Sequence, residues 1–134
     1  MRQFIIPYLI FENALEVANY YKDIFNGVIE YTMFGKDVPN CPEDELEKVM
    51  HLELVIQDQY LYLADGLDKP SNQTMLLLDY KNLDEMKVAY NKMVPSSEVV
   101  QELHDTFWGA VFGVLKDKYG MKWEFHFMKP KIKA

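Results

Sequence analysis

The sequence is poor in the residues that mark several protein classes. It has one cysteine, Cys41, so no disulfide forms within the chain, in keeping with a reducing cytoplasm. Its six glycines build no phosphate-binding loop. No apolar run approaches the roughly 20 residues that cross a bilayer. The segment MRQFIIPYLIFENALE is apolar only briefly and is typical of a strand, not of a signal peptide. We therefore expect a cytoplasmic protein that makes no membrane contact.

Positive charge is also scarce. The chain has 14 basic and 21 acidic residues, for a net charge of −7. Its lysines and arginines form no stripe interleaved with aromatic residues, so nucleic acid is a poor partner. The 134 residues, 49% of them hydrophobic, are enough for one domain with a core and too few for two ordinary ones. We expect a single domain, 1–134.

The first half predicts a strand, a helix and three more strands. Residues 3–11 are apolar at successive positions, which favours a strand buried on both faces. A helix then begins at the cap Asn13 and ends at Asn26-Gly27. A strand at 28–34 and a hairpin at 48–65 follow, separated by an acidic loop with at most a helical turn at 43–48.

The second half repeats this plan. A strand at 73–80 leads to a helix that is capped by Asn82, and a short strand at 98–103 follows. The last hairpin has strands from Thr106 to Leu115 and from Met121 to Phe127, with 116–120 as its turn. The two Asn caps lie about half the chain apart, so the pattern predicts an α+β fold of two βαβββ modules, 1–67 and 70–128, with 66–72 as the linker.

Strand alternation selects the polar candidates. In the last strand Trp123 and Phe125 fall on one face, and Glu124 and His126 on the other. In the strand at 48–56, His51 and Glu53 lie opposite a row of apolar side chains. These two residues can act together as acid and base. Alternatively, they pair with polar neighbours across the sheet.

The residues PYLIFENALEVANYYKDIF, VMHLELVIQDQYLYLAD and DTFWGAVFGVLKDKYGMKWEF carry a family resemblance. In this order they resemble the PhnB-like branch of the glyoxalase/bleomycin resistance/dioxygenase (vicinal oxygen chelate) superfamily, over nearly the whole chain. The most specific piece is Thr106-Phe107-Trp108-Gly109 followed by 117–123. The resemblance implies two βαβββ modules whose sheets curve around a cleft with the helices outside, and a homodimer.

The resemblance also implies a metal position. Metal-dependent members take a ligand from the last strand, four residues after the turn glycine, and Glu124 stands there. The other two ligand positions, in the first strand of each module, are occupied by residues 6–8 (Ile-Pro-Tyr) and 74–76 (Thr-Met-Leu). Zn²⁺ and similar ions need about three protein ligands. A divalent metal is therefore not expected to bind tightly.

Two groups of candidate residues follow. The catalytic candidates are Glu124, which is also the metal candidate, and His51. The ligand-binding candidates share a place on the inner faces that the resemblance implies, and they are Tyr8, Glu53, Tyr62, Trp108 and His126. For the aromatic members the alternative is a place in the core, and for His126 it is a partly exposed surface.

Three functions are compatible with these residues. The first is a pocket that binds a small molecule, cationic or aromatic, without the usual complete metal triad. The second is a metal-dependent glyoxalase-like lyase or isomerase, or a dioxygenase, acting on a small oxygenated substrate. The third is a dimeric scaffold without chemistry. The two missing ligand positions favour the first function, while Glu124 keeps the second open.

Overall fold

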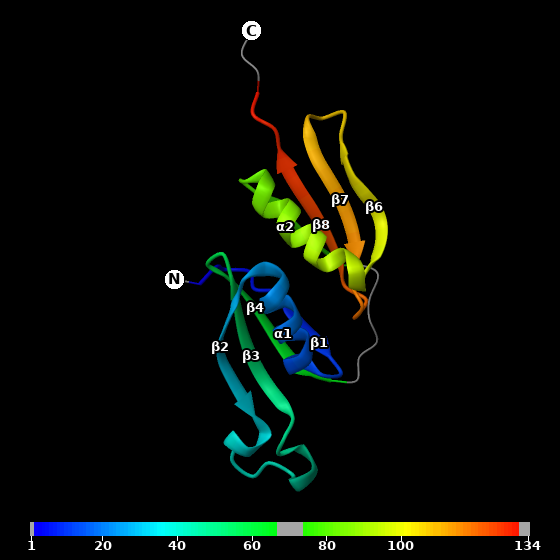
Figure 1. Ribbon diagram of the computed structural model, residues 1–134. Coiled ribbons are helices and arrows are strands. Elements are labelled where there is room, and N and C mark those ends of the chain that lie inside the picture. Colours follow the sequence, from blue (N-terminus) through cyan, green and yellow to red (C-terminus); the bar gives the residue numbers. More distant parts are fainter. Residues whose placement is uncertain (1, 67–73, 132–134) are drawn as a thin grey trace. The chain divides into compact units, whose positions relative to one another are not determined.

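The computed structural model describes residues 2–66 and 74–131 (Figure 1). The chain divides into two compact units, Met1–Lys69 and Pro70–Ala134. All but Gly66 of the predicted linker lies outside the described residues. Within the described ranges, no helix is long and apolar enough to span a membrane.

Unit 1 is a four-stranded sheet with one helix. Its elements are β1 (Tyr8–Phe11), α1 (Ala14–Phe25), β2 (Val28–Phe34), β3 (Val49–Ile56) and β4 (Gln59–Asp65). The strand order is β1-β4-β3-β2, in which β1 runs parallel to β4 and the other pairs are antiparallel. Short 3₁₀ turns at Gly35–Asp37 and Glu43–Glu45 occupy the loop before β3. The predicted first βαβββ module is confirmed.

The position of α1 follows from its caps and its apolar face. The Asn13 side chain accepts a hydrogen bond from the Glu16 amide, and Asn26 ends the helix in the left-handed conformation at φ 55°. The buried residues of α1 pack against one face of the sheet, where Leu52, Leu54 and Leu63 are fully buried. The helix thus covers one face only, and the opposite face carries the polar residues of β3 and β4.

Unit 2 repeats this architecture. Its elements are β5 (Met75–Tyr80), α2 (Leu83–Met93), a 3₁₀ turn (Val94–Ser96), β6 (Glu98–Asp105), β7 (Ala110–Lys116) and β8 (Lys122–Met128). The strand order is β5-β8-β7-β6, again with one parallel pair, β5 and β8. Asn82 caps α2, and Trp123 and Phe125 are buried in the core as predicted. The second βαβββ module is confirmed as well.

The prediction of a long, doubly buried first strand is wrong. Only Tyr8–Phe11 forms a strand, and Phe4 and Ile5 are 99% and 79% exposed. The segment before the strand runs beside β4 without a full ladder, and Pro7 has no amide hydrogen to donate to one. Its carbonyl accepts from the Tyr62 amide at 2.9 Å. Apolar composition therefore overstated both the length and the burial of this strand.

The predicted strand from Thr106 to Leu115 also begins too early. The Thr106 hydroxyl accepts a hydrogen bond from the Ala110 amide at 3.0 Å, and Gly109 has φ 90°. Both features belong to a turn between β6 and β7, because a φ of 90° lies far from the strand region and suits glycine, which has no Cβ. Trp108 consequently lies in a turn, 46% exposed, and not within a strand.

Candidate functional site

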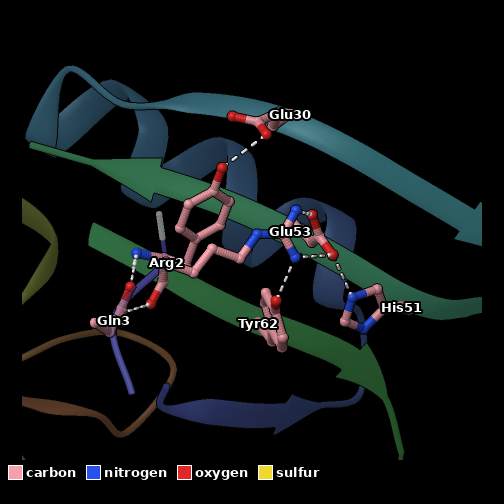
Figure 2. A network of polar contacts seen from close by, with 7 residues as sticks. Arg2, Gln3, Glu30, His51, Glu53 and Tyr62 are labelled. Carbon is pink, nitrogen blue, oxygen red and sulfur yellow. Dashed lines mark hydrogen bonds and ion pairs between the residues drawn. The ribbon is translucent and has the colours of Figure 1, made fainter. Parts of the chain in front are cut away.

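A polar cluster lies on the face of the unit 1 sheet that α1 leaves uncovered. Its members are Arg2, Tyr8, His51, Glu53, Tyr60 and Tyr62, most of which appear in Figure 2. Strand alternation explains the arrangement, because Leu52 and Leu54 point to the helix while His51 and Glu53 point away. Glu53 stands directly opposite Tyr62 of β4, and Tyr62 stands opposite Tyr8 of β1.

Glu53 is the centre of the cluster. Although it is charged, the residue is only 8% exposed. Its Oε1 pairs with the Arg2 guanidinium at 2.8 Å, and its Oε2 accepts from Arg2 Nη1 at 3.1 Å and lies 2.9 Å from His51 Nε2. Burial would raise the pKa of Glu53, but the hydrogen bonds and charges of His51 and Arg2 outweigh it and lower the pKa below its ordinary value. Glu53 is thus held as a carboxylate.

Arg2 reaches the cluster because the neighbouring Gln3 anchors the segment before β1. The Gln3 side-chain amide donates to the Tyr60 carbonyl at 2.6 Å and accepts from the Tyr60 amide at 3.1 Å, so it replaces a strand's backbone pairing. The Arg2 guanidinium then lies 4.3 Å from the centre of the Tyr60 ring and donates to the Tyr62 hydroxyl. Tyr60 in turn donates to Glu30 at 2.8 Å.

His51 connects the buried carboxylate to a half-exposed phenol. In its neutral form the imidazole carries its hydrogen on Nε2, facing Glu53, because a carboxylate only accepts hydrogen bonds. Nδ1 then accepts from the Tyr8 hydroxyl at 2.7 Å. Burial first, and then the charges of Tyr62 and Glu53, raise the pKa of Tyr8. The result is a continuous chain of hydrogen bonds from Glu53 through His51 to Tyr8.

Aromatic rings pack around the imidazole. Tyr62 meets His51 edge to face at a centroid distance of 4.6 Å, and Tyr8 lies 5.6 Å away. The ring of Tyr31, on β2, lies 6.3 Å from His51, but its hydroxyl is not part of the hydrogen-bond chain. The closer contacts, those of Tyr62 and Tyr8, restrict the rotation of His51 and keep both of its nitrogens aimed at their partners.

The remaining predicted residues belong to unit 2. Glu124 lies on the face of β8 opposite Trp123 and Phe125, in register with Leu77 of β5. His126 Nδ1 lies 3.1 Å from Asp79, whose other oxygen pairs with Lys81. The Trp108 ring in the β6–β7 turn lies 5.9 Å from Phe112. Of the seven predicted site residues, the polar cluster brings together Tyr8, His51, Glu53 and Tyr62.

The described side chains do not form a metal centre. Across 2–66 and 74–131, no three His, Cys, Asp or Glu side chains gather to hold an ion. In the polar cluster, both His51 nitrogens and both Glu53 oxygens are engaged by protein partners. These residues therefore do not fit a resident metal. For Glu124, the metal candidate, the expectation that no metal is tightly bound stays a prediction.

Sequence reasoning missed Arg2, Gln3 and Glu30. Arg2 precedes the first strand and has no periodic pattern that marks it as inward-facing. Its place depends on the double hydrogen bond between Gln3 and the Tyr60 backbone, which is a tertiary contact. The one available signal was the polar pair Arg2-Gln3 ahead of an apolar run, and it does not identify a partner.

Comparison with known proteins agrees with this architecture. A family model described as 3-demethylubiquinone-9 3-methyltransferase matches residues 3–126. Protein YjdN of Escherichia coli is 22% identical over 140 residues, covering 92% of this chain and 94% of YjdN. The crystal structure of PA1353 from Pseudomonas aeruginosa is similar with a TM-score of 0.83 and 27% identity, over 97% of this chain and 99% of that one.

A third relative has the same fold. It is a putative 3-demethylubiquinone-9 3-methyltransferase, PhnB protein, from Bacillus cereus, with a TM-score of 0.75 and 21% identity over 93% of this chain and 99% of that one. Together with the two βαβββ units, these matches confirm the predicted fold class and the resemblance. The chain belongs to the family whose model is described as 3-demethylubiquinone-9 3-methyltransferase, and it shares the fold of the PhnB protein from Bacillus cereus.

Proposed function

We propose that this protein binds a small molecule on the polar cluster of unit 1. The observation that carries the proposal is the burial of Glu53 between Arg2 and His51 on a sheet face that no helix of its unit covers. Removing a carboxylate from water costs several kcal/mol, and well-packed apolar residues usually support a fold as well as a buried ion pair does. Such clusters with shifted pKa values concentrate at functional sites.

The chemistry of the cluster favours an aromatic or cationic ligand. Tyr8 is 48% exposed and presents both a ring face and a hydroxyl oxygen that can accept a hydrogen bond. The charge of Arg2 is balanced by Glu53, which leaves Glu30 as an additional negative charge beside Tyr60. Tyrosine rings bind cations through their faces, and the net charge of −7 attracts cations to the whole chain.

The proposal does not depend on methyl transfer, the activity named in the family's description. Methyl transfer requires a methyl donor, and dinucleotide-like cofactors are commonly held by a glycine-rich turn between a strand and a helix. In each unit the turn from the first strand to the helix is made by residues 12–13 and 81–82, which include no glycine. The described residues offer more support for ligand binding by the polar cluster.

Calorimetric titration with benzyltrimethylammonium, an aromatic cation, and with benzoate, an aromatic anion, tests the proposal. We expect the cation to bind and Glu53→Gln to weaken its binding about tenfold or more, because His51 and Arg2 lose the carboxylate that positions them. Glu47→Gln, at an exposed position of the same unit, removes the same charge and serves as the control. Equal weakening by both variants would show only a net-charge effect and would contradict a specific site.

A metal-dependent lyase, isomerase or dioxygenase is the second candidate, and the position of Glu124 on the uncovered face of β8 supports it. Purification without an affinity tag, followed by metal analysis, separates the two candidates. Stoichiometric Zn²⁺, Ni²⁺ or Mn²⁺ retained by the native chain and lost from Glu124→Gln would put the metal-dependent reaction first. If neither a ligand nor a metal bound, the third candidate, a dimeric scaffold without chemistry, would remain.

We also propose a homodimer that works in the cytoplasm. The support for a dimer is the exposed aromatic and aliphatic surface of both units, which includes Phe4, Ile5, Phe107 and Trp108. The single cysteine, Cys41, agrees with a reducing compartment. Sedimentation velocity at micromolar concentration should show the mass of two chains, and a purely monomeric species would contradict the dimer.

A further inference from the structure

We propose that Tyr8 is a nucleophilic hydroxyl activated by His51, and that the cluster takes small aromatic esters as substrates. This inference rests on the proposed ligand site and adds a reaction to it. It comes from three consecutive contacts within unit 1. Tyr8 lies 2.7 Å from His51 Nδ1, His51 Nε2 lies 2.9 Å from Glu53, and Glu53 lies 2.8 Å from Arg2.

The order of these groups is that of an activated nucleophile. A hydroxyl within hydrogen-bond reach of a base, with the base oriented by a third group, is the arrangement that makes weak nucleophiles reactive. Glu53 fixes the hydrogen of neutral His51 on Nε2, which leaves the Nδ1 lone pair facing the hydroxyl. Tyr8 therefore corresponds to the nucleophile, His51 to the general base, and Glu53 to the positioning residue.

Exposure decides which member of the chain meets a substrate. Tyr8 is 48% exposed, whereas the side chains of His51 and Glu53 are 20% and 10% exposed. An electrophile on this face thus meets the phenol oxygen before the covered imidazole. Because its surroundings raise the pKa of Tyr8, the hydroxyl keeps its proton until a base removes it during attack. The adjacent Nδ1 provides that base.

The chemical step is acyl transfer to Tyr8. The phenol oxygen attacks the ester carbonyl carbon as its proton moves to His51 Nδ1, and the resulting imidazolium is stabilised by the Glu53 carboxylate. When the tetrahedral adduct collapses, the bond from the carbonyl carbon to the ester oxygen breaks. The acyl group remains on Tyr8. The leaving oxygen departs as an anion or takes the proton back from His51, so no oxidant or other co-reactant is needed.

The test uses p-nitrophenyl acetate, because its leaving group absorbs visible light. We expect a burst approaching one p-nitrophenolate per chain, with peptide mass spectrometry locating the acetyl group on Tyr8. Tyr8→Phe should abolish the burst, and His51→Gln should slow it about 100-fold, the usual contribution of a general base. Glutamine retains a donor toward Glu53 but has no basic nitrogen facing Tyr8.

The controls separate chemistry from structure. Tyr31→Phe removes a hydroxyl from an equally exposed tyrosine outside the hydrogen-bond chain and should leave the burst unchanged. For Glu53→Gln, ¹⁵N NMR of His51 should show that hydrogen is no longer confined to Nε2, together with a slower burst. A loss of burst with an unaltered His51 spectrum would overturn the positioning role of Glu53.

The experiments distinguish a wrong ligand site from a wrong acylation step. Acetyl groups found only on lysines, or on His51 itself, would overturn the nucleophilic role of Tyr8, while binding of benzyltrimethylammonium would leave the ligand site standing. Absence of binding with acetylated Tyr8 would instead contradict the ligand class. If a variant fails to fold, the position of the acetyl group in the wild-type protein still shows whether Tyr8 is the nucleophile.

Discussion

In the described part of each unit one carboxylate is buried, and the two are used differently. Among the described residues, Glu53 in unit 1 and Asp117 in unit 2 are the buried charged side chains. Asp117 accepts from the Tyr119 and Met121 amides and from the Trp123 indole, and these three partners are backbone groups of its own turn and a core side chain. Glu53 instead binds the side chains of Arg2 and His51 on an uncovered sheet face. One carboxylate holds a turn together, while the other builds a polar surface.

The paired strands make the comparison position by position. Tyr8 and Tyr62 are partners in the parallel pair of unit 1, as Leu77 and Glu124 are in unit 2. Across the antiparallel pair, Tyr62 stands opposite Glu53 and Glu124 stands opposite Val114. Valine therefore occupies in unit 2 the position that the buried carboxylate has in unit 1. The βαβββ fold does not require an ion pair at this position, which supports a functional origin for the polar cluster.

The largest expected effect on stability is at Asp117. Asp117→Asn places an amide NH₂ group against N–H donors, either the indole of Trp123 or the two backbone amides. We expect the free energy of unfolding to fall by about 3 kcal/mol, since a buried charged acceptor is lost. Urea denaturation measures this fall in the free energy of unfolding, and Asp44→Asn, in the exposed loop, is the control. If Asp117→Asn were as stable as the wild type, Asp117 would not be the residue that holds its turn together.

Glu53→Gln should cost less stability and should depend on pH. We expect a loss of about 1 to 2 kcal/mol near neutral pH, because one partner of the pair, Arg2, is 43% exposed and is rehydrated. The folded pKa of Glu53 lies below its unfolded value of about 4.3. The ionised Glu53 carboxylate therefore stabilises the folded state at pH values above the unfolded pKa. This stabilisation disappears as the pH falls through the folded pKa.

Urea denaturation of wild type and Glu53→Gln at pH 7 and at pH 3 checks this dependence. The difference between the two proteins should shrink toward acid. A difference that grows on acidification would show that the pKa of Glu53 is raised in the folded state, contrary to the ion pair with Arg2.

Gln3→Ala should have a smaller effect that is specific to the cluster. The variant removes the two hydrogen bonds to the Tyr60 backbone, so the segment that carries Arg2 loses its anchor. We expect a loss of about 1 kcal/mol in stability. Binding of benzyltrimethylammonium should weaken in parallel. Unchanged binding would indicate that Arg2 reaches Glu53 without the anchor.

The smallest expected stability change is at Glu124. Glu124→Gln should alter the free energy of unfolding by less than about 0.5 kcal/mol, because no cationic partner contacts this carboxylate among the described residues. Any change in ligand binding or proton transfer would then report a direct contact with Glu124. A loss of stability comparable with that of Glu53→Gln would show that Glu124 has a buried partner.

The sequence predicted what is locally encoded. The caps Asn13 and Asn82 and the alternation at His51-Leu52-Glu53 are short-range signals, and they placed both helices and the uncovered faces correctly. The turn at Thr106–Gly109 has aromatic residues with high strand propensity, so the sequence wrongly predicts a strand there. Its hydrogen bond from Ala110 to the Thr106 hydroxyl has no pattern of its own.

The sequence predicts the residues of the site less completely than it predicts the fold. Strand alternation predicts His51 and Glu53 as an acid and base pair, but it is equally compatible with cross-strand pairing to other polar residues. The contacts of Arg2 with Glu53 and of Tyr8 with His51 join residues that lie 51 and 43 positions apart in the chain. Such contacts depend on how the segment before β1 lies against β4, and a single sequence does not encode that placement in a local pattern.

The central claim is that the ligand binds to the polar cluster of unit 1 and not to the corresponding face of unit 2. Two-dimensional NMR of ¹⁵N-labelled protein titrated with benzyltrimethylammonium tests it most directly. The account predicts saturable shift changes at Tyr8, His51, Glu53 and Tyr62, and their loss in Glu53→Gln but not in Glu47→Gln. Saturable changes confined to Phe112, Val114 and Glu124, with the unit 1 signals unmoved, would contradict it.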